Sequence, residues 1–141
     1  MKIAIYGIKF NPDKLTTFQN LFDYLKSHVN LKEVSIYSGL YKQMKGNVTG
    51  VEGFGKFSYS DEITNFDLLI CLGGDGSMLD SLSIVRNSGV PVFGINTGRL
   101  GFLSSISTEE VKVPLSEILK GNIKFDRRSV LKLTTKSNHF G

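Results

Sequence analysis

The 141-residue sequence has no tryptophan, only three prolines and two histidines, and a single cysteine, Cys71. One cysteine permits no internal disulfide, which is consistent with a reducing compartment, so we expect a cytoplasmic protein. Neither a CxxC nor an HExxH motif is present, and His28 and His139 lie far apart in the sequence. The sequence therefore does not predict a zinc site.

Strong charge and long hydrophobic runs are also absent. The chain has 17 Lys and Arg against 13 Asp and Glu, a net charge of +4, and no basic run. This mild excess suits an anionic small molecule and does not favour nucleic acid. The apolar stretches are only strand-sized, so no membrane span is predicted. The length fits one domain, or one domain and the start of another.

Short apolar segments alternate with helical patterns over most of the chain, and a polar, glycine-rich connection covers residues 38–60. The predicted strands are residues 3–8, 34–37, 67–72 and 91–95, and the predicted helices are residues 11–25, 40–45, 77–87 and 108–121. Such alternation is typical of a parallel sheet covered on both faces. We therefore predict an α/β domain over residues 1–121, with an open, mostly parallel sheet and helices on both faces.

The pattern changes after this domain. Residues 123–136, "IKFDRRSVLKLTTK", alternate polar and apolar side chains, and no helix follows them. This alternation predicts a strand of an antiparallel sheet. We interpret residues 122–141 as the first strand region of a second, all-β domain that is truncated.

The glycine-rich stretch after the third predicted strand is the strongest indication of function. In "DLLICLGGDGSMLDSL", residues 67–82, an apolar run ends at Gly73-Gly74-Asp75-Gly76. Ligands of open parallel sheets bind beyond the carboxyl ends of the strands, and a helix that starts there attracts phosphate. The glycines would let a ligand approach the main chain, although a strand-to-helix turn that needs glycine for its geometry explains them equally well.

A carboxylate at Asp75 would repel a phosphate unless it has a task there. It could accept a proton from a hydroxyl that attacks phosphorus, hold a magnesium ion that bridges phosphates, or cap the helix, a role that Ser77 could also fill. The spacing excludes a P-loop, because no GxxxxGK[ST] is present, and no GxGxxG follows the first strand.

These residues resemble a known group of kinases. Gly73 to Ser77 resembles the GGDG[TS] motif shared by NAD kinases, phosphofructokinases and the diacylglycerol and sphingosine lipid kinases. "GINTGRLGFL", residues 94–103, resembles the NxGxLGFL block of NAD kinases. "IKFDRRSVLKL", residues 123–133, is similar to the segment that leads into their second domain, with Arg127 or Arg128 at its arginine. Together the three blocks indicate the NAD kinase family, with a fold like that of phosphofructokinases.

The resemblance implies transfer of a phosphoryl group from ATP, or polyphosphate in some members, to the 2′-hydroxyl of the adenosine ribose of NAD, giving NADP. It also implies a divalent metal such as magnesium and a homo-oligomer. Asp75 would be the catalytic proton acceptor. The residues implied to bind the ligands are Gly73, Gly74, Asp75, Gly76, Ser77, Leu79 and Phe102. The residues alone favour core packing for Leu79 and Phe102, with Leu79 on one helix side beside Met78, Leu82 and Val85.

Two positions depart from the family pattern. Ser77 stands where threonine is usual and keeps the hydroxyl, whereas Asp80 stands where a basic or small residue is common, so that position's phosphate contact is not carried over. Arg99 could offer a forked donor to a phosphate, but a solvated turn residue is favoured.

The family's Asn-Glu/Asp pair, which fixes the dinucleotide, belongs to the second domain. This sequence ends before it, so we expect an inactive N-terminal fragment with half a site. The alternatives are another GGDG kinase, acting on a sugar phosphate or a lipid, and a non-catalytic nucleotide-binding module.

Overall fold

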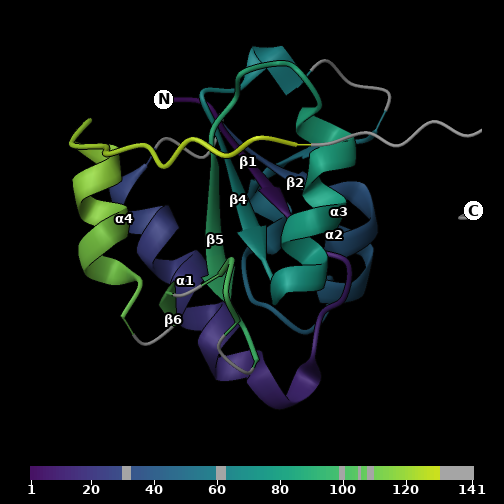
Figure 1. Ribbon diagram of the computed structural model, residues 1–141. Helices are drawn as coiled ribbons and strands as arrows, with labels where there is room; N and C mark the ends of the chain where they lie inside the picture. Colours follow the sequence, from purple (N-terminus) through teal and green to yellow (C-terminus); the bar gives the residue numbers. More distant parts are fainter. Residues whose placement is uncertain (30–32, 60–62, 99–100, 105, 108–109, 131–141) are drawn as a thin grey trace, which may run out of the picture.

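The computed structural model describes residues 1–29, 33–59, 63–98, 101–104, 106–107 and 110–130. Its centre is one six-stranded sheet in which every pair of neighbours is parallel, in the order β3-β2-β1-β4-β5-β6 (Figure 1). The strands are β1 (Ile3–Tyr6), β2 (Val34–Tyr37), β3 (Gly55–Phe57), β4 (Leu68–Leu72), β5 (Val92–Asn96) and β6 (Ile106–Ser107). The four predicted strands and the predicted α/β class are confirmed, and the short edge strands β3 and β6 are additional.

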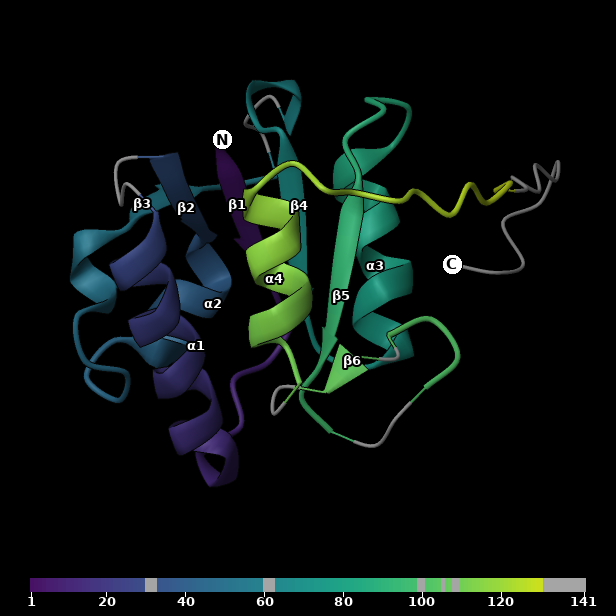
Figure 2. The ribbon, with the colours of Figure 1, turned by 90° about the vertical axis from the view of Figure 1, so that its left-hand side faces the viewer.

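Helices cover both faces of this sheet. They are α1 (Leu15–His28), α2 (Ser38–Met44), α3 (Asp75–Val85) and α4 (Lys112–Leu119), with short 3-10 turns η1 (Pro12–Lys14), η3 (Val51–Gly53) and η4 (Ile63–Asn65). Figure 2 shows α1 and α4 side by side over one face, with α3 behind the sheet on the opposite face. None of the helices in the described ranges is long and apolar enough to cross a membrane.

The core consists of two layers because successive strand side chains point to opposite faces. Ile3 and Ile5 of β1 pack in the cluster that contains α1 and α4, whereas Ala4 and Tyr6 pack in the cluster that contains the end of α3. Cys71 of β4 is fully buried in the second cluster, as predicted, and burial raises the pKa of its thiol to about 12. Strands buried on both faces explain the continuous apolar runs in the sequence.

Helix α3 differs from its prediction in two ways. It begins at Asp75 rather than Ser77, because Gly74 takes the N-cap position and an acidic residue suits the first turn of a helix. Its buried residues are Ser81, Ile84 and Val85, so the predicted apolar side is wrong for Leu79 and Leu82 and is confirmed for Val85. The small Ser81 is fully buried, and its hydroxyl is satisfied within the helix by donating to the carbonyl of Met78, at 2.6 Å.

The segment after α4 also differs from its prediction. Residues 122–130 form no strand, and they cross the edge of the sheet where β5 begins, from α4 toward α3 (Figures 1 and 2). A strand needs a neighbouring strand for its backbone hydrogen bonds, and the part of the chain described by the structure supplies none to this segment. The antiparallel strand predicted over 123–136 is therefore not formed over 123–130 in this chain, and because its partner strand would belong to the predicted second domain, the interpretation of this segment stays a prediction. Residues 131–136 lie outside the described residues, and the domain boundary stays a prediction.

The turn that ends α3 contains a backbone conformation suited to glycine. Arg86 has φ 45° and ψ −122°, and the N–H of Ser88 donates to the carbonyl of Val85 at 2.9 Å. This is the first central position of a type II′ turn, where a side chain costs about 1–3 kcal/mol. We expect Arg86→Gly to raise the free energy of unfolding by about 1 kcal/mol in urea titrations. Arg86→Ala keeps the β-carbon and should not stabilise, so equal gains from both variants would contradict the explanation.

Candidate functional site

The glycine-rich loop lies where the strand order of the sheet reverses. From β1 the chain extends the sheet through β2 and β3, and it then returns to the other side of β1 with β4. Sheets of this order bind ligands outside the carboxyl ends of their strands at the reversal point. Gly73 directly follows β4 at that end, and the backbones are close there, since a β-carbon on Gly7 would lie 2.8 Å from the carbonyl oxygen of Leu72.

The glycines of this loop are present for two different reasons. Gly73 has φ +151°, and a β-carbon there would lie 2.2 Å from Oγ of Ser77, so internal geometry requires glycine. A β-carbon on Gly74 or Gly76 would meet nothing within 4 Å, and neither residue has a positive φ. Folding geometry therefore accounts for Gly73 alone. The open space over Gly74 and Gly76 suits the close approach of a ligand to the main chain.

The start of α3 leaves backbone donors beside this open space. No side chain caps the helix, since its N-cap residue is Gly74. The N–H groups of the first turn have no partner within their own helix, and they carry the positive end of the helix dipole. Asp75 and Ser77 are thus not caps, and the predicted capping roles are wrong. The loop has the geometry of an anion site.

The carboxylate of Asp75 is held by the turn that follows β5. Oδ2 accepts the N–H of Phe102 at 2.9 Å, and Oδ1 accepts those of Leu103 at 2.9 Å and Ser104 at 3.3 Å. A β-carbon on Gly101 would lie 2.2 Å from Oδ1, so the carboxylate occupies the space of a side chain. The N–H groups of Leu103 and then Phe102 hold the pKa of the Asp75 carboxyl below its usual range, so it is ionised at neutral pH. Through these hydrogen bonds Asp75 connects the glycine loop, residues 73–77, to the end of the block at residues 94–103.

Two further residues of this region received no role from the sequence, although Asn96 is the first residue of the NxGxLGFL block. Ser104 is fully buried, and its hydroxyl donates to the carbonyl of Gly73 at 3.2 Å. Asn96, the last residue of β5, is 3% exposed and donates through Nδ2 to the carbonyl of Ser104 at 3.1 Å. A serine next to a glycine-rich turn normally indicates a solvated residue, so nothing in the sequence indicated this burial.

The two apolar site residues are exposed. Phe102 is 96% exposed and Leu79 is 58% exposed, so core packing is wrong for both. Leu79 lies on the outer side of α3, and the side chain of Phe102 is exposed while its backbone N–H donates to Asp75. Met78 does pack inside, against the backbone of Gly94. Arg99 lies outside the described residues.

Asp80 faces a cluster of tyrosines. Its Oδ2 accepts hydrogen bonds from the hydroxyls of Tyr6 and, at 3.3 Å, Tyr59. The rings of Tyr6, Tyr37 and Tyr59 contact one another, with centroids 5.0–6.3 Å apart. Burial first, and then the hydrogen bond to Asp80, raises the pKa of the Tyr6 phenol. Asp80 therefore connects α3 to the end of β1 and to the segment after β3, which explains why an acidic residue is accommodated at this position.

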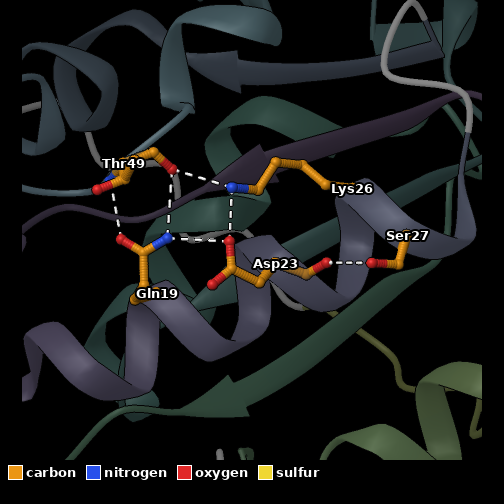
Figure 3. A network of polar contacts seen from close by, with 5 residues as sticks. All are labelled: Gln19, Asp23, Lys26, Ser27 and Thr49. Atoms are coloured by element: carbon orange, nitrogen blue, oxygen red, sulfur yellow. Dashed lines mark hydrogen bonds and ion pairs between the residues drawn. The ribbon is translucent and has the colours of Figure 1, made fainter.

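A separate polar network stabilises the loop after α2. Thr49 donates its N–H to Gln19 at 2.8 Å, and its carbonyl accepts from Gln19 and from Lys26, which also pairs with Asp23 (Figure 3). Figure 3 also shows Ser27 bonded to the carbonyl of Asp23 on the same helix. A cavity of about 220 Å³ is lined by residues 46–50 and Glu52. None of its lining residues belongs to the glycine loop or to the 101–104 turn, so this cavity is not part of the candidate site. The network itself holds the loop around Thr49 against α1.

Comparisons with known proteins agree with these motifs. Residues 7–123 match the family model described as the ATP-NAD kinase N-terminal domain. The chain is 36% identical to the NAD kinase of Christiangramia forsetii, over 99% of this chain and 47% of that protein. It is 31% identical to the NAD kinase of Cytophaga hutchinsonii, over 100% of this chain and 48% of that protein. The chain therefore spans about half the length of the curated relatives it matches.

Among solved structures, the fold resembles the crystal structure of yeast NADH kinase complexed with NADH. The TM-score is 0.67 at 24% sequence identity, over 86% of this chain and 38% of that chain. At this identity the likeness concerns the fold.

Proposed function

We propose, since this chain belongs to the NAD kinase family, that it supplies the phosphate-facing half of an enzyme that phosphorylates NAD at the 2′-hydroxyl of its adenosine ribose. ATP, or polyphosphate, is the proposed phosphoryl donor, and NADP is the product. The observation that carries the proposal is the open space over Gly74 and Gly76, next to the ionised carboxylate of Asp75. The open backbone can bind a phosphate, and the carboxylate beside it can accept the proton of a hydroxyl that attacks this phosphate.

The residues of the site take distinct roles in this reaction. The backbone of Gly74 and Gly76 and the first turn of α3 bind phosphate oxygens. Ser77 offers a hydroxyl beside Gly73. Leu79 and Phe102, whose side chains are exposed, would each offer an apolar contact to the adenine ring.

Asp75 receives the proton of the attacking hydroxyl. A carboxylate has about four lone-pair positions, and three are used by backbone N–H groups, so one remains for a ribose hydroxyl. As the ribose oxygen bonds to the transferred phosphorus, the bond to the leaving phosphate breaks and the hydroxyl proton moves to Asp75. The rest of catalysis is positioning and electrostatic stabilisation.

Magnesium is expected to accompany the phosphate donor. Within the described ranges, no three His, Cys, Asp or Glu side chains gather to hold a metal ion, and both oxygens of Asp75 accept N–H groups. The described residues therefore do not fit a resident metal ion, and magnesium would enter with ATP, bound to its phosphates. Assembly into a homo-oligomer and a cytoplasmic location stay predictions.

One observation favours a second candidate function, a nucleotide-binding module without catalysis. The Asp75 carboxylate is already used to fix the 101–104 turn, and the N–H groups that hold it reduce its basicity. A base works best when its pKa lies near the working pH. In this candidate the glycine loop would bind phosphate, and Asp75 would only shape the loop.

A chimera tests the proposed function directly. We would join this chain to the remaining part of the Christiangramia forsetii NAD kinase and measure NADP formation with ATP and with polyphosphate. We expect activity from the chimera and none from the isolated chain, because positioning of the ribose needs the other half of the site. Circular dichroism would confirm that both proteins are folded.

Two outcomes would contradict this proposal. A folded chimera that binds ATP without forming NADP would favour the non-catalytic module, and one that phosphorylates a sugar phosphate or a lipid would favour another GGDG kinase. Activity of the isolated chain would contradict the half-site argument. A second chimera with the Cytophaga hutchinsonii protein controls for a poor junction.

A further inference from the structure

We propose that Ser104 and Asn96 are positioning residues, which hold the glycine loop and the 101–104 turn in one arrangement around Asp75. The inference deepens the proposed function and rests on it for its catalytic consequence. Neither residue touches the reacting atoms in this proposal. Both act through the carboxylate of Asp75 and through the backbone of Gly73.

Ser104 is the residue that contacts both parts of the site. Its hydroxyl donates to the carbonyl of Gly73 at 3.2 Å, and its N–H donates to Oδ1 of Asp75 at 3.3 Å. The side chain is fully buried, so water does not compete for these contacts. The Gly73 carbonyl belongs to the peptide that leads into Gly74, so the Ser104 hydroxyl also influences the orientation of the phosphate-facing backbone.

Asn96 fixes the orientation of Ser104. Nδ2 donates to the carbonyl of Ser104 at 3.1 Å and to its hydroxyl oxygen at 3.3 Å, while Oδ1 accepts the N–H of Gly98 at 2.7 Å. The reversed amide would place an NH2 group against the N–H of Gly98, so only one orientation satisfies all three contacts. Because the Ser104 hydroxyl accepts from Asn96, its own hydrogen is directed at Gly73.

The anchor of this chain of contacts is the sheet itself. Asn96 is the last residue of β5, and its neighbour Ile95 pairs with β4 at Leu72, immediately before Gly73. In addition, the N–H of Gly73 donates to the carbonyl of Ile95 at 3.0 Å. The ends of two paired strands and the 101–104 turn are therefore joined through two small polar side chains. A change at either side chain should alter the number of N–H groups that reach Asp75.

The chain offers a matched control, because Ser81 is also a fully buried serine. Its hydroxyl donates to a backbone carbonyl, that of Met78, at 2.6 Å, and among the described residues none of its hydrogen bonds reaches Asp75 or the 101–104 turn. Ser104→Ala and Ser81→Ala therefore make the same chemical change at the same burial. If Ser104 only stabilised the fold, both variants would lower stability and neither would change the ionisation of Asp75.

The first experiment follows the ionisation of Asp75 in the isolated chain, by recording its carboxyl carbon shift against pH with NMR. Ser104→Ala keeps the backbone N–H but removes the hydroxyl that fixes the turn to the Gly73 carbonyl. The N–H groups of the turn should then reach the carboxylate less closely, which disfavours its ionised form and should raise the titration midpoint of Asp75 by at least about half a unit. The amide protons of residues 102 and 103 should shift as well, and Ser81→Ala should change neither signal.

The second experiment measures kinetics in the chimera, where Ser104→Ala should lower kcat roughly 10-fold while the KM for ATP changes less than about twofold. If the Ser104 variant is unfolded, Asn96→Ser takes its place, because it removes the amide that orients Ser104. We expect the same changes in the Asp75 midpoint, kcat and KM. Equal effects of Ser104→Ala and Ser81→Ala, or an unchanged Asp75 midpoint, would overturn the proposal. The NMR result does not depend on activity. A failure of the proposed function can therefore be told apart from a failure of the positioning proposal.

Discussion

Asp75→Asn is expected to lower NADP formation by the chimera by about 10²- to 10⁴-fold, the usual contribution of a general base. Asparagine is nearly isosteric with aspartate but accepts no proton at neutral pH. It also replaces one acceptor oxygen with an NH2 group, which would face the N–H of Phe102 or those of Leu103 and Ser104. The variant should therefore also loosen the 101–104 turn, visible as faster hydrogen exchange of its amides.

The pH dependence of stability separates the role of Asp75 in the turn from its role in catalysis. Because the folded pKa of Asp75 lies below its ordinary value, its ionisation stabilises the fold above about pH 4, and this contribution is lost as the pH falls through the folded pKa. Urea titrations should show wild type more stable than Asp75→Asn at pH 7 and the difference shrinking in acid.

An Asn variant that turns over within a few-fold of wild type would show that Asp75 is not the base.

Alanine at Gly73 and alanine at Gly76 should have opposite effects on stability. At Gly73 the new β-carbon would clash with Ser77 at a φ that disfavours side chains, so we expect a loss of about 3 kcal/mol in the free energy of unfolding. At Gly76, within α3 and facing open space, alanine should stabilise by about 0.5–1 kcal/mol. The measurement is urea unfolding of the isolated chain.

Enzyme activity tests whether a ligand occupies the open space over Gly76. Although Gly76→Ala makes the fold more stable, it should reduce kcat/KM of the chimera at least about 10-fold, because its methyl group would occupy the space of a bound phosphate. Gly74→Ala is the companion variant, since a β-carbon there is equally uncontacted. If both variants are stable and fully active, no ligand approaches this backbone, and the glycines are not explained by binding.

The central sheet was predictable from the sequence because β1 and β4 are continuous apolar runs buried on both faces. Strand β3 was missed because Gly55, Lys56 and Phe57 are too short a segment to show a period. The predicted apolar side of α3 is only half correct: Met78 and Val85 pack inside, but the helix also packs through the small Ser81 and leaves Leu79 outside.

The glycine loop and Asp75 could be identified from the sequence, but their partners could not. The donors to the Asp75 carboxylate are backbone N–H groups 27 to 29 residues away, and every residue type except proline has one. Asp80 likewise meets Tyr6 and Tyr59 only because the fold brings β1, the end of β3 and α3 together. Contacts of this kind depend on the tertiary arrangement, which the local sequence does not contain.

The tyrosine cluster around Asp80 gives this protein a built-in optical reporter. The chain has five tyrosines and no tryptophan, so its ultraviolet emission comes from phenols alone. Three of the five belong to the cluster, and two of those donate to a carboxylate, an arrangement that quenches phenol emission. We therefore expect the phenol emission to rise when α3 moves away from β1, so a ligand that shifts this helix should be detectable by fluorescence without any label.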